Sequence, residues 1–282
     1  MFLKQQQDLQ QKKTLLLTIN DVVSDADKLS QAAAIIRRGG LVAFPTETVY
    51  GLGANALDPQ AVKGIFAAKG RPQDNPLIIH LYDPSQTQQY AKNIPPVYYA
   101  LCERFSPGPL TVILTKRDCI PMETSGGLDT VAVRIPSHPV AREIIRLAGV
   151  PVAAPSANLS GSPSPTTAQH CVHDLWGRVD AIVDGGACGV GLESTVISLT
   201  GEKPVLLRPG AVTPQMLREL LPDLQIHQAV TEKLQAGVKA SSPGMKYKHY
   251  APQGEVTVFR GEHAVENIIS RYDASEDALI LA

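Results

Sequence analysis

The chain has 282 residues, with 26 Lys and Arg against 27 Asp and Glu, so its formal net charge is −1. A charge this close to neutral excludes a protein whose whole surface acts as a polycation on nucleic acid. Hydrophobic residues make up 44% and charged residues 19% of the chain, which excludes a disordered protein and indicates a folded one. It contains no apolar run of about eighteen residues and no secretory leader, so we expect a cytoplasmic protein without a membrane span.

The apolar pattern predicts helices and strands in alternation. Helical spacing predicts helices at Ser24–Arg38, from Pro59 onward, and at Pro139–Leu147, Thr166–Trp176 and Pro214–Leu221. Short apolar runs predict strands at Leu41–Phe44, Leu77–Leu81, Leu110–Leu114, Val131–Ile135, Val152–Ala154, Ala181–Val183, Thr195–Leu199 and Val205–Leu207. The gap at Gly201–Pro204 is too short for a crossover helix, so part of the sheet must be antiparallel. We therefore predict an α/β domain with an open, twisted, mixed β-sheet and flanking helices.

The C-terminal part of the chain has a different pattern. Periodicity is lost after Gln225, and Ser241–Gly244 has the composition of a linker. A strand at Val256–Phe259, a helix at Ala264–Tyr272 and a strand at Ala278–Leu281 would make a partial βαβ unit, which is too small to bury a core of its own. The predicted boundaries are a main domain over 14–222, a linker over 223–254 and a partial C-terminal α/β domain over 255–282.

Polar clusters next to the predicted strands are the candidate functional residues. Lys69 and Arg71 flank a glycine before a strand and could hold an anion, although a solvated helix C-terminus would also explain them. Ser156 and Asn158 follow a strand and would point the same way in an extended chain, although a simple turn is the alternative. Because ligands of open α/β sheets bind beyond strand ends, the clusters together predict a binding cleft.

Standard catalytic and metal motifs are missing from the sequence. It contains no GxxxxGK[ST] loop, no GxGxxG opening a helix, no GxSxG and no HExxH. His170 and His173 have helical spacing, but no third or fourth ligand is near in sequence. The four cysteines form no CxxC pair. We therefore predict no resident metal site and no disulfide framework.

Three segments together resemble a known family. These segments are GLVAFPTETVYGLG at 40–53, the KxR of Lys69 and Arg71, and the SxN of Ser156 and Asn158. They closely resemble the YrdC-like family and, within it, the two-domain threonylcarbamoyl-AMP synthases. The resemblance covers roughly residues 16–252 and includes SPGMKYKHYAP at 242–252, which is similar to the interdomain linker of the two-domain members. Those members continue past the first βαβ unit of the C-terminal domain, so the resemblance implies a truncated C-terminal domain here.

The resemblance implies a reaction in which L-threonine, bicarbonate and ATP give L-threonylcarbamoyl-AMP and diphosphate, for threonylcarbamoyladenosine formation in tRNA. ATP is then a substrate that Mg²⁺ accompanies, bicarbonate is a co-substrate, and a tRNA-modifying threonylcarbamoyl transferase complex receives the product. Direct contact with tRNA is left open. Two alternatives are a carbamoyl-adenylating maturation domain and a noncatalytic RNA-binding module of the same fold.

The resemblance also implies roles for individual residues. The predicted catalytic residues, which bring the anionic reactants together, are Lys69, Arg71, Ser156 and Asn158. The predicted ATP-binding residues are Arg71, Asn75, Thr130, Ser156, Ser164, Arg208 and Tyr250. The predicted threonine-binding residues are Thr48, His80, Arg134, Ala154 and Ser194. We further expect the linker to close over the cleft as a lid that brings Tyr250 near the nucleotide.

Overall fold

A computed structural model of the chain describes residues 12–73, 75–230 and 257–273. The chain divides into a first unit, Met1–His249, and a second unit, Tyr250–Ala282. No helix in the described ranges is long and apolar enough to cross a lipid bilayer.

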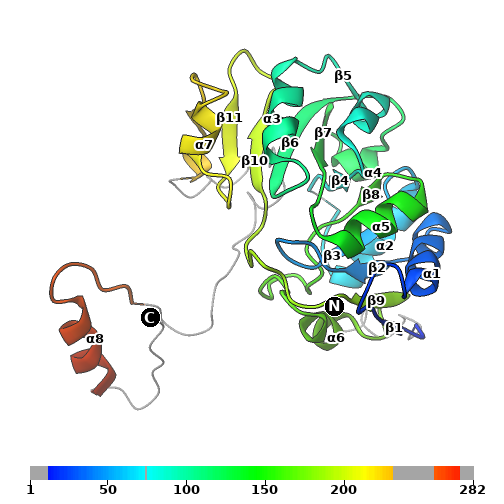
Figure 1. The fold of residues 1–282 in the computed structure, drawn as a ribbon, viewed down its shortest axis with the longest axis horizontal. Coiled ribbons are helices and arrows are strands. Elements are labelled where there is room, and N and C mark those ends of the chain that lie inside the picture. The colour runs from blue at the N-terminus through cyan, green and yellow to red at the C-terminus, as the bar shows by residue number, and fades with distance from the viewer. Residues whose placement is uncertain (1–11, 74, 231–256, 274–282) are drawn as a thin grey trace, which may run out of the picture. The chain divides into compact units, whose positions relative to one another are not determined.

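The first unit is built on one mixed sheet (Figure 1). Its strands are β1 Leu15–Thr18, β2 Val42–Phe44, β3 Gly51–Asn55, β4 Ile78–His80, β5 Ala91–Lys92, β6 Leu110–Lys116, β7 Thr130–Arg134, β8 Val152–Ala153, β9 Ala181–Asp184, β10 Thr195–Ser198, β11 Val205–Arg208 and β12 Gln225–Ile226. Along the sheet the order is β1-β9-β2-β3-β8-β4-β7-β6-β10-β11-β12, and β5 pairs with β6. The sheet contains parallel pairs, such as β4 with β7, and antiparallel pairs, such as β10 with β11, which confirms the predicted mixed sheet.

Helices pack on both faces of the sheet. In the first unit they are α1 Ala26–Arg37, α2 Pro59–Lys69, α3 Val97–Phe105, α4 Met122–Ser125, α5 Pro139–Ala148, α6 Ala168–Leu175 and α7 Pro214–Arg218, with 3-10 turns at Pro84–Gln89 and Gln228–Val230. Residues of β2 alternate between two apolar cores, since Val42 and Phe44 pack with α1 and α5 while Ala43 packs with α2 and α6. Burial on both sides explains why β2 reads as a continuous apolar run.

Several elements differ from those that the sequence pattern predicts. β3 was not predicted because Gly51, Gly53 and Asn55 are poor strand formers, yet it pairs with both β2 and β8 inside the sheet. Helix α3 was also missed, and so was β12, which lies within the stretch predicted to be a linker and pairs with β11. Pairing with neighbouring strands outweighs local propensity in β3 and β12.

The second unit contains one helix in its described residues, α8 Ala264–Asp273, where the sequence predicts a helix. Residues 257–260 form no strand, so the predicted strand at Val256–Phe259 was wrong over its described part. A strand requires a hydrogen-bonded neighbour, and the other predicted strand, Ala278–Leu281, lies outside the described residues.

We predict that Gly53→Ala lowers the free energy of unfolding by about 1–3 kcal/mol, because overpacking a core strains it. A Cβ at this position would lie 2.5 Å from Cε1 of Phe44 and 2.9 Å from Cγ1 of Val152, both fully buried side chains. The matched control is Gly64→Ala inside α2, where a Cβ would lie 3.5 Å from Leu41. There alanine should stabilise the protein by about 1 kcal/mol through helix propensity. Urea denaturation measures the free energy of unfolding of both variants. Changes of the same sign in the two variants would contradict the packing argument.

Candidate active site

The loop between β2 and β3 forms one wall of the site. The hydroxyl of Thr46 organises this loop by donating to the carbonyl of Val49 at 2.6 Å and accepting from the backbone amides of Thr48 and Val49 at 3.2 and 3.3 Å. Because the one hydroxyl proton of Thr46 goes to Val49, the hydroxyl of Thr48 donates to Thr46 across 2.9 Å. The oxygen of Thr48 is thereby left as an acceptor.

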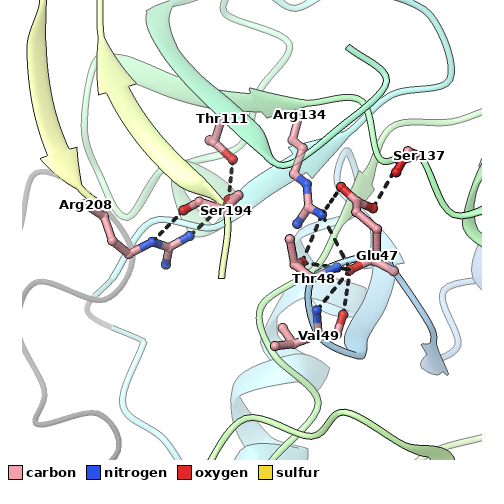
Figure 2. Close-up of polar contacts among 9 residues, drawn as sticks. Glu47, Thr48, Val49, Thr111, Arg134, Ser137, Ser194 and Arg208 are labelled. Carbon is pink, nitrogen blue, oxygen red and sulfur yellow. Dashed lines mark hydrogen bonds and ion pairs between the residues drawn. The ribbon is translucent and has the colours of Figure 1, made fainter. Parts of the chain in front are cut away.

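A buried arginine meets this loop from the end of β7. Nη2 of Arg134 donates to the Glu47 carboxylate at 2.7 Å and to the Thr48 hydroxyl at 2.9 Å (Figure 2). The second carboxylate oxygen of Glu47 accepts from the backbone amide of Ser137 at 3.0 Å. Burial acts to raise the pKa of the Glu47 carboxyl, but the charge and hydrogen bond of Arg134 outweigh it and hold that pKa below its ordinary value. The pair is therefore ionised at neutral pH.

His80 lies beside Arg134, because β4 and β7 are parallel and pair these two residues. Nδ1 of His80 lies 3.3 Å from the carbonyl oxygen of Val152, which can only accept, so Nδ1 carries the proton and Nε2 is the acceptor. Burial, and after it the charge of Arg134, lowers the pKa of His80 to about 3. The imidazole is thus a neutral acceptor next to a fixed cation.

A second arginine lies at the end of β11. Arg208 donates from Nε to the backbone carbonyl of Ser194 at 3.0 Å and from Nη2 to the Ser194 hydroxyl at 3.1 Å. The Ser194 hydroxyl also lies 2.7 Å from that of Thr111 on β6 (Figure 2). Parallel pairing of β6 with β10 and antiparallel pairing of β10 with β11 place these three residues at one edge of the sheet.

Lys69, at the C-terminal end of α2, lies behind the segment that carries the SxN pattern. Its ammonium donates to the carbonyls of Ser156 and Asn158 at 2.5 and 2.6 Å, and the Asn158 side-chain oxygen is 3.4 Å away. Ser156 in turn donates to that side-chain oxygen at 2.5 Å. Burial, and after it the charge of Arg71, lowers the pKa of Lys69 to about 7. Lys69 therefore holds the shape of the 156–158 segment.

The segments described above surround a pocket that lies beyond the ends of several strands. The sequence-predicted residues that line it are Thr48, Arg71, His80, Arg134, Ala154, Ser156, Ser194 and Arg208. Its other lining residues include Thr46, Tyr50, Gly51, Pro155 and Glu193. The structure thus brings together all five predicted threonine-binding residues with three of the predicted ATP-binding residues.

Other predicted residues lie elsewhere. Asn75 is buried with neither side-chain amide atom bonded in the described chain. Thr130 begins the strand that Arg134 ends, roughly 13 Å away at the rise of a strand. Ser164 donates to Glu193 at 2.6 Å, and Tyr250 lies outside the described residues.

Sequence reasoning missed two carboxylates, Glu47 and Glu193. Glu47 stands inside the quoted GLVAFPTETVYGLG segment, and a lone carboxylate just after a predicted strand was the available signal. Glu193 immediately precedes Ser194, but its contact with Ser164 joins positions 29 residues apart. Such pairings depend on the tertiary fold.

Comparison with known proteins gives consistent results. The Sua5_yciO_yrdC family model, described as telomere recombination, matches residues 34–210, and the model of the threonylcarbamoyl-AMP synthase C-terminal domain matches residues 212–282. The first of these matches spans more than half of the chain.

The chain belongs to the Sua5/YciO/YrdC family.

Two relatives and one solved structure are similar to most of the chain. A threonylcarbamoyl-AMP synthase of Pyrococcus abyssi is 49% identical over 264 residues, which are 92% of this chain and 77% of the relative. The threonylcarbamoyl-AMP synthase of Bacillus subtilis is 46% identical over 263 residues, 92% of this chain and 75% of the relative. The crystal structure of P. abyssi Sua5 complexed with L-threonine has a TM-score of 0.84 and 48% identity, and the match covers 93% of this chain and 77% of that one.

The low pKa of His80 predicts a specific pH dependence of stability. The unfolded chain binds a proton at this position below about pH 6.5, whereas the folded protein does so only near pH 3. Protonation of this group in the unfolded chain should therefore lower the free energy of unfolding by about 1.4 kcal/mol for each pH unit below 6.5. Urea denaturation of His80→Asn, whose amide can still donate to Val152, should lack this contribution. Equal slopes in both proteins would contradict the assignment.

The contacts of Lys69 predict that Lys69→Met lowers the free energy of unfolding by about 1–3 kcal/mol or more, because it leaves buried carbonyl oxygens without a donor. Arg71→Ala is the matched control, since Arg71 lies two residues further along and lines the pocket. It should change that free energy much less. If denaturation curves show the same loss of stability in Arg71→Ala and in Lys69→Met, then Lys69 has no particular role in holding the 156–158 segment.

Proposed function

We propose that this pocket is where the chain joins L-threonine, bicarbonate and ATP into L-threonylcarbamoyl-AMP and diphosphate. The observation that carries the proposal is a buried Arg134 and a neutral His80 side by side in the same pocket as Arg71 and Arg208. An amino acid, a carbamate and a triphosphate are all anionic at one end, and fixed cations are what bring such groups together. The threonylcarbamoyl-AMP synthases among the relatives support the same reaction.

The threonine subsite is assigned by matching donors with acceptors. The threonine carboxylate needs a cationic donor, and Nε of Arg134 is a buried donor without a partner in the described chain. The threonine hydroxyl is a donor, which suits the acceptor Nε2 of His80. The oxygen of Thr48 is an acceptor for the amine before it becomes a carbamate. Ala154 and Ser194 complete the lining on this side.

The nucleotide subsite takes the rest of the pocket. Arg71 and Arg208 supply positive charge toward the triphosphate, and Ser156 supplies a neutral hydroxyl beside them. Lys69 and Asn158 act from behind by fixing the segment on which Ser156 stands. Residues proposed for ATP from the family resemblance alone are Asn75, Thr130, Ser164 and Tyr250.

The chemistry that follows is positioning more than acid–base catalysis. The threonine amine forms a bond to the carbon of bicarbonate, and a bicarbonate oxygen leaves as water together with the amine proton. An oxygen of the resulting carbamate then attacks the α-phosphorus, and the bond to diphosphate breaks as diphosphate leaves. Arg134 keeps the amino acid in one orientation, and the arginines on the nucleotide side offset the charge that builds up as the two anions approach. His80 stays neutral throughout the physiological range because of its pKa near 3.

The residues of this pocket suit Mg²⁺ only when the triphosphate supplies further ligands. Glu193 is the only carboxylate among the described residues that line it, and the described chain has no cluster of three His, Cys, Asp or Glu side chains for a metal. Mg²⁺ is commonly held by one or two carboxylates together with substrate phosphates and water. We therefore propose that Mg²⁺ arrives with ATP, beside Glu193, where it would neutralise phosphate charge.

The product determines the proposed partners. A mixed carbamic–phosphoric anhydride is prone to hydrolysis, so a threonylcarbamoyl transferase complex that modifies tRNA is proposed to take it directly. We propose that this step takes place in the cytoplasm, where ATP and tRNA are both available. Direct contact between this chain and tRNA is not required by the reaction.

The direct test is release of diphosphate from ATP by the purified full chain with bicarbonate and each of three amino acids. L-threonine should support release, because its carboxylate, hydroxyl and methyl groups all find partners. Serine, which lacks the methyl, should have a kcat/KM about 10–200-fold lower, since one methyl group is worth about 1–3 kcal/mol. Valine, which lacks the hydroxyl, should be worse than serine, because Nε2 of His80 would be left unpaired.

The control is the same assay without bicarbonate, in which release should fall to the background of ATP hydrolysis. Threonine-independent release, or none under any condition, would refute the proposed function. Valine used as well as serine would refute only the role of His80.

A further inference from the structure

Glu47 is a largely enclosed carboxylate that the proposed chemistry leaves unassigned. It is not among the residues that line the pocket, yet both its oxygens are engaged, one by Nη2 of Arg134 at 2.7 Å and the other by the amide of Ser137 at 3.0 Å. The side chains of Glu47 and Arg134 are only 14% and 5% exposed. Among the described residues, Glu47 is thus the carboxylate that neutralises the Arg134 guanidinium.

The way in which Arg134 is held determines what it can offer a ligand. Its hydrogen bonds to the described residues all come from Nη2, which reaches Glu47, Thr48 and, at 3.5 Å, Thr46. Nε is buried and has no partner in the described chain. A guanidinium is planar and rigid, so fixing one nitrogen against a carboxylate fixes the direction of the others. Glu47 therefore sets the orientation in which the remaining donors of Arg134 meet a substrate.

We propose that Glu47 is a positioning residue for threonine: by clamping Nη2 of Arg134 it sets the affinity for the amino acid without touching it. This inference rests on the proposed function, because it takes threonine as the ligand of Arg134. It assigns a role to a side chain outside the pocket lining, and it concerns the amino-acid subsite, since the carboxylate oxygens of Glu47 are held by Arg134 and Ser137.

The second task of residue 47 is carried by its backbone and does not depend on the side chain. The carbonyl of Glu47 accepts from the amide of Val190 at 2.8 Å, and that of Thr48 accepts from the amide of Gly191 at 3.0 Å. These two bonds hold the segment that leads to Ser194. A substitution of the Glu47 side chain leaves both bonds in place, so it tests the carboxylate alone.

Glutamine is the sharpest replacement. Its amide oxygen can accept from Arg134 or from Ser137, but its amide nitrogen is a donor and cannot accept from the other. It also leaves the guanidinium charge without a buried counter-charge. We expect Glu47→Gln to raise the KM for threonine about ten- to a hundredfold, the range of one charge-assisted hydrogen bond, while the KM for ATP changes less than about twofold.

The experiment measures diphosphate release while threonine and ATP are varied separately, and titrates threonine alone by calorimetry. Glu143→Gln is the matched control, because Glu143 pairs with Arg146 at 2.6 Å on the surface of α5, away from the pocket. It should leave both KM values unchanged. Glu47→Asp keeps the charge but is shorter by one methylene, so its KM for threonine should lie between those of the wild type and Glu47→Gln. If Glu47→Gln does not fold, the KM values of Glu47→Asp test the proposal instead.

An unchanged KM for threonine in Glu47→Gln, or an equal rise in the KM values for threonine and ATP with a lower melting temperature, would overturn the inference. The latter pattern is what a merely structural residue would give. A wild-type chain that binds threonine in the calorimeter but releases no diphosphate would refute the proposed function, and the calorimetric comparison would still test Glu47.

Discussion

Burying the charge of Arg134 is the constraint around which the pocket is arranged. A cation removed from water is costly unless a counter-charge and hydrogen bonds compensate, and here Glu47, Thr48 and Thr46 supply them. All three come from the one loop between β2 and β3. The need to neutralise a residue on β7 thus fixes where this loop runs, and the loop in turn fixes the segment after residue 188 through its backbone carbonyls.

The two buried cations of the site, Arg134 and Lys69, do different work. Arg134 is balanced by a carboxylate and keeps a donor for a ligand, whereas Lys69 faces carbonyl oxygens and has a pKa near 7. A compact ammonium can satisfy several carbonyl groups at once, which suits it to supporting a wall. A planar guanidinium presents directed donors, which suits it to recognising a carboxylate. The residue type at each position follows from this division.

The sequence was sufficient to predict the mixed sheet, most of its strands and eight of the residues that line the pocket. What it could not show depends on packing between distant segments. β3 is a strand because both its neighbours pair with it, although its glycines disfavour one. Lys69 and Arg71 look equivalent in the KxR pattern, and only the fold shows that one supports the wall while the other lines the pocket. Glu47 escaped notice because its partner is 87 residues away.

The order of strands in the sheet also bears on how the protein is made. β1 pairs with β9, so the first strand has no neighbour until residue 181 has been synthesised, and the pocket needs Ser194 and Arg208 as well. Contacts between such distant positions slow folding, since the entropy cost of closing the loop must be met before strand pairing gives any gain in free energy. During synthesis the N-terminal two thirds of the first unit would therefore emerge without the completed pocket that we propose for threonine. Threonine bound at the proposed site would stabilise only the completed domain, and would therefore favour the finished fold over its precursors.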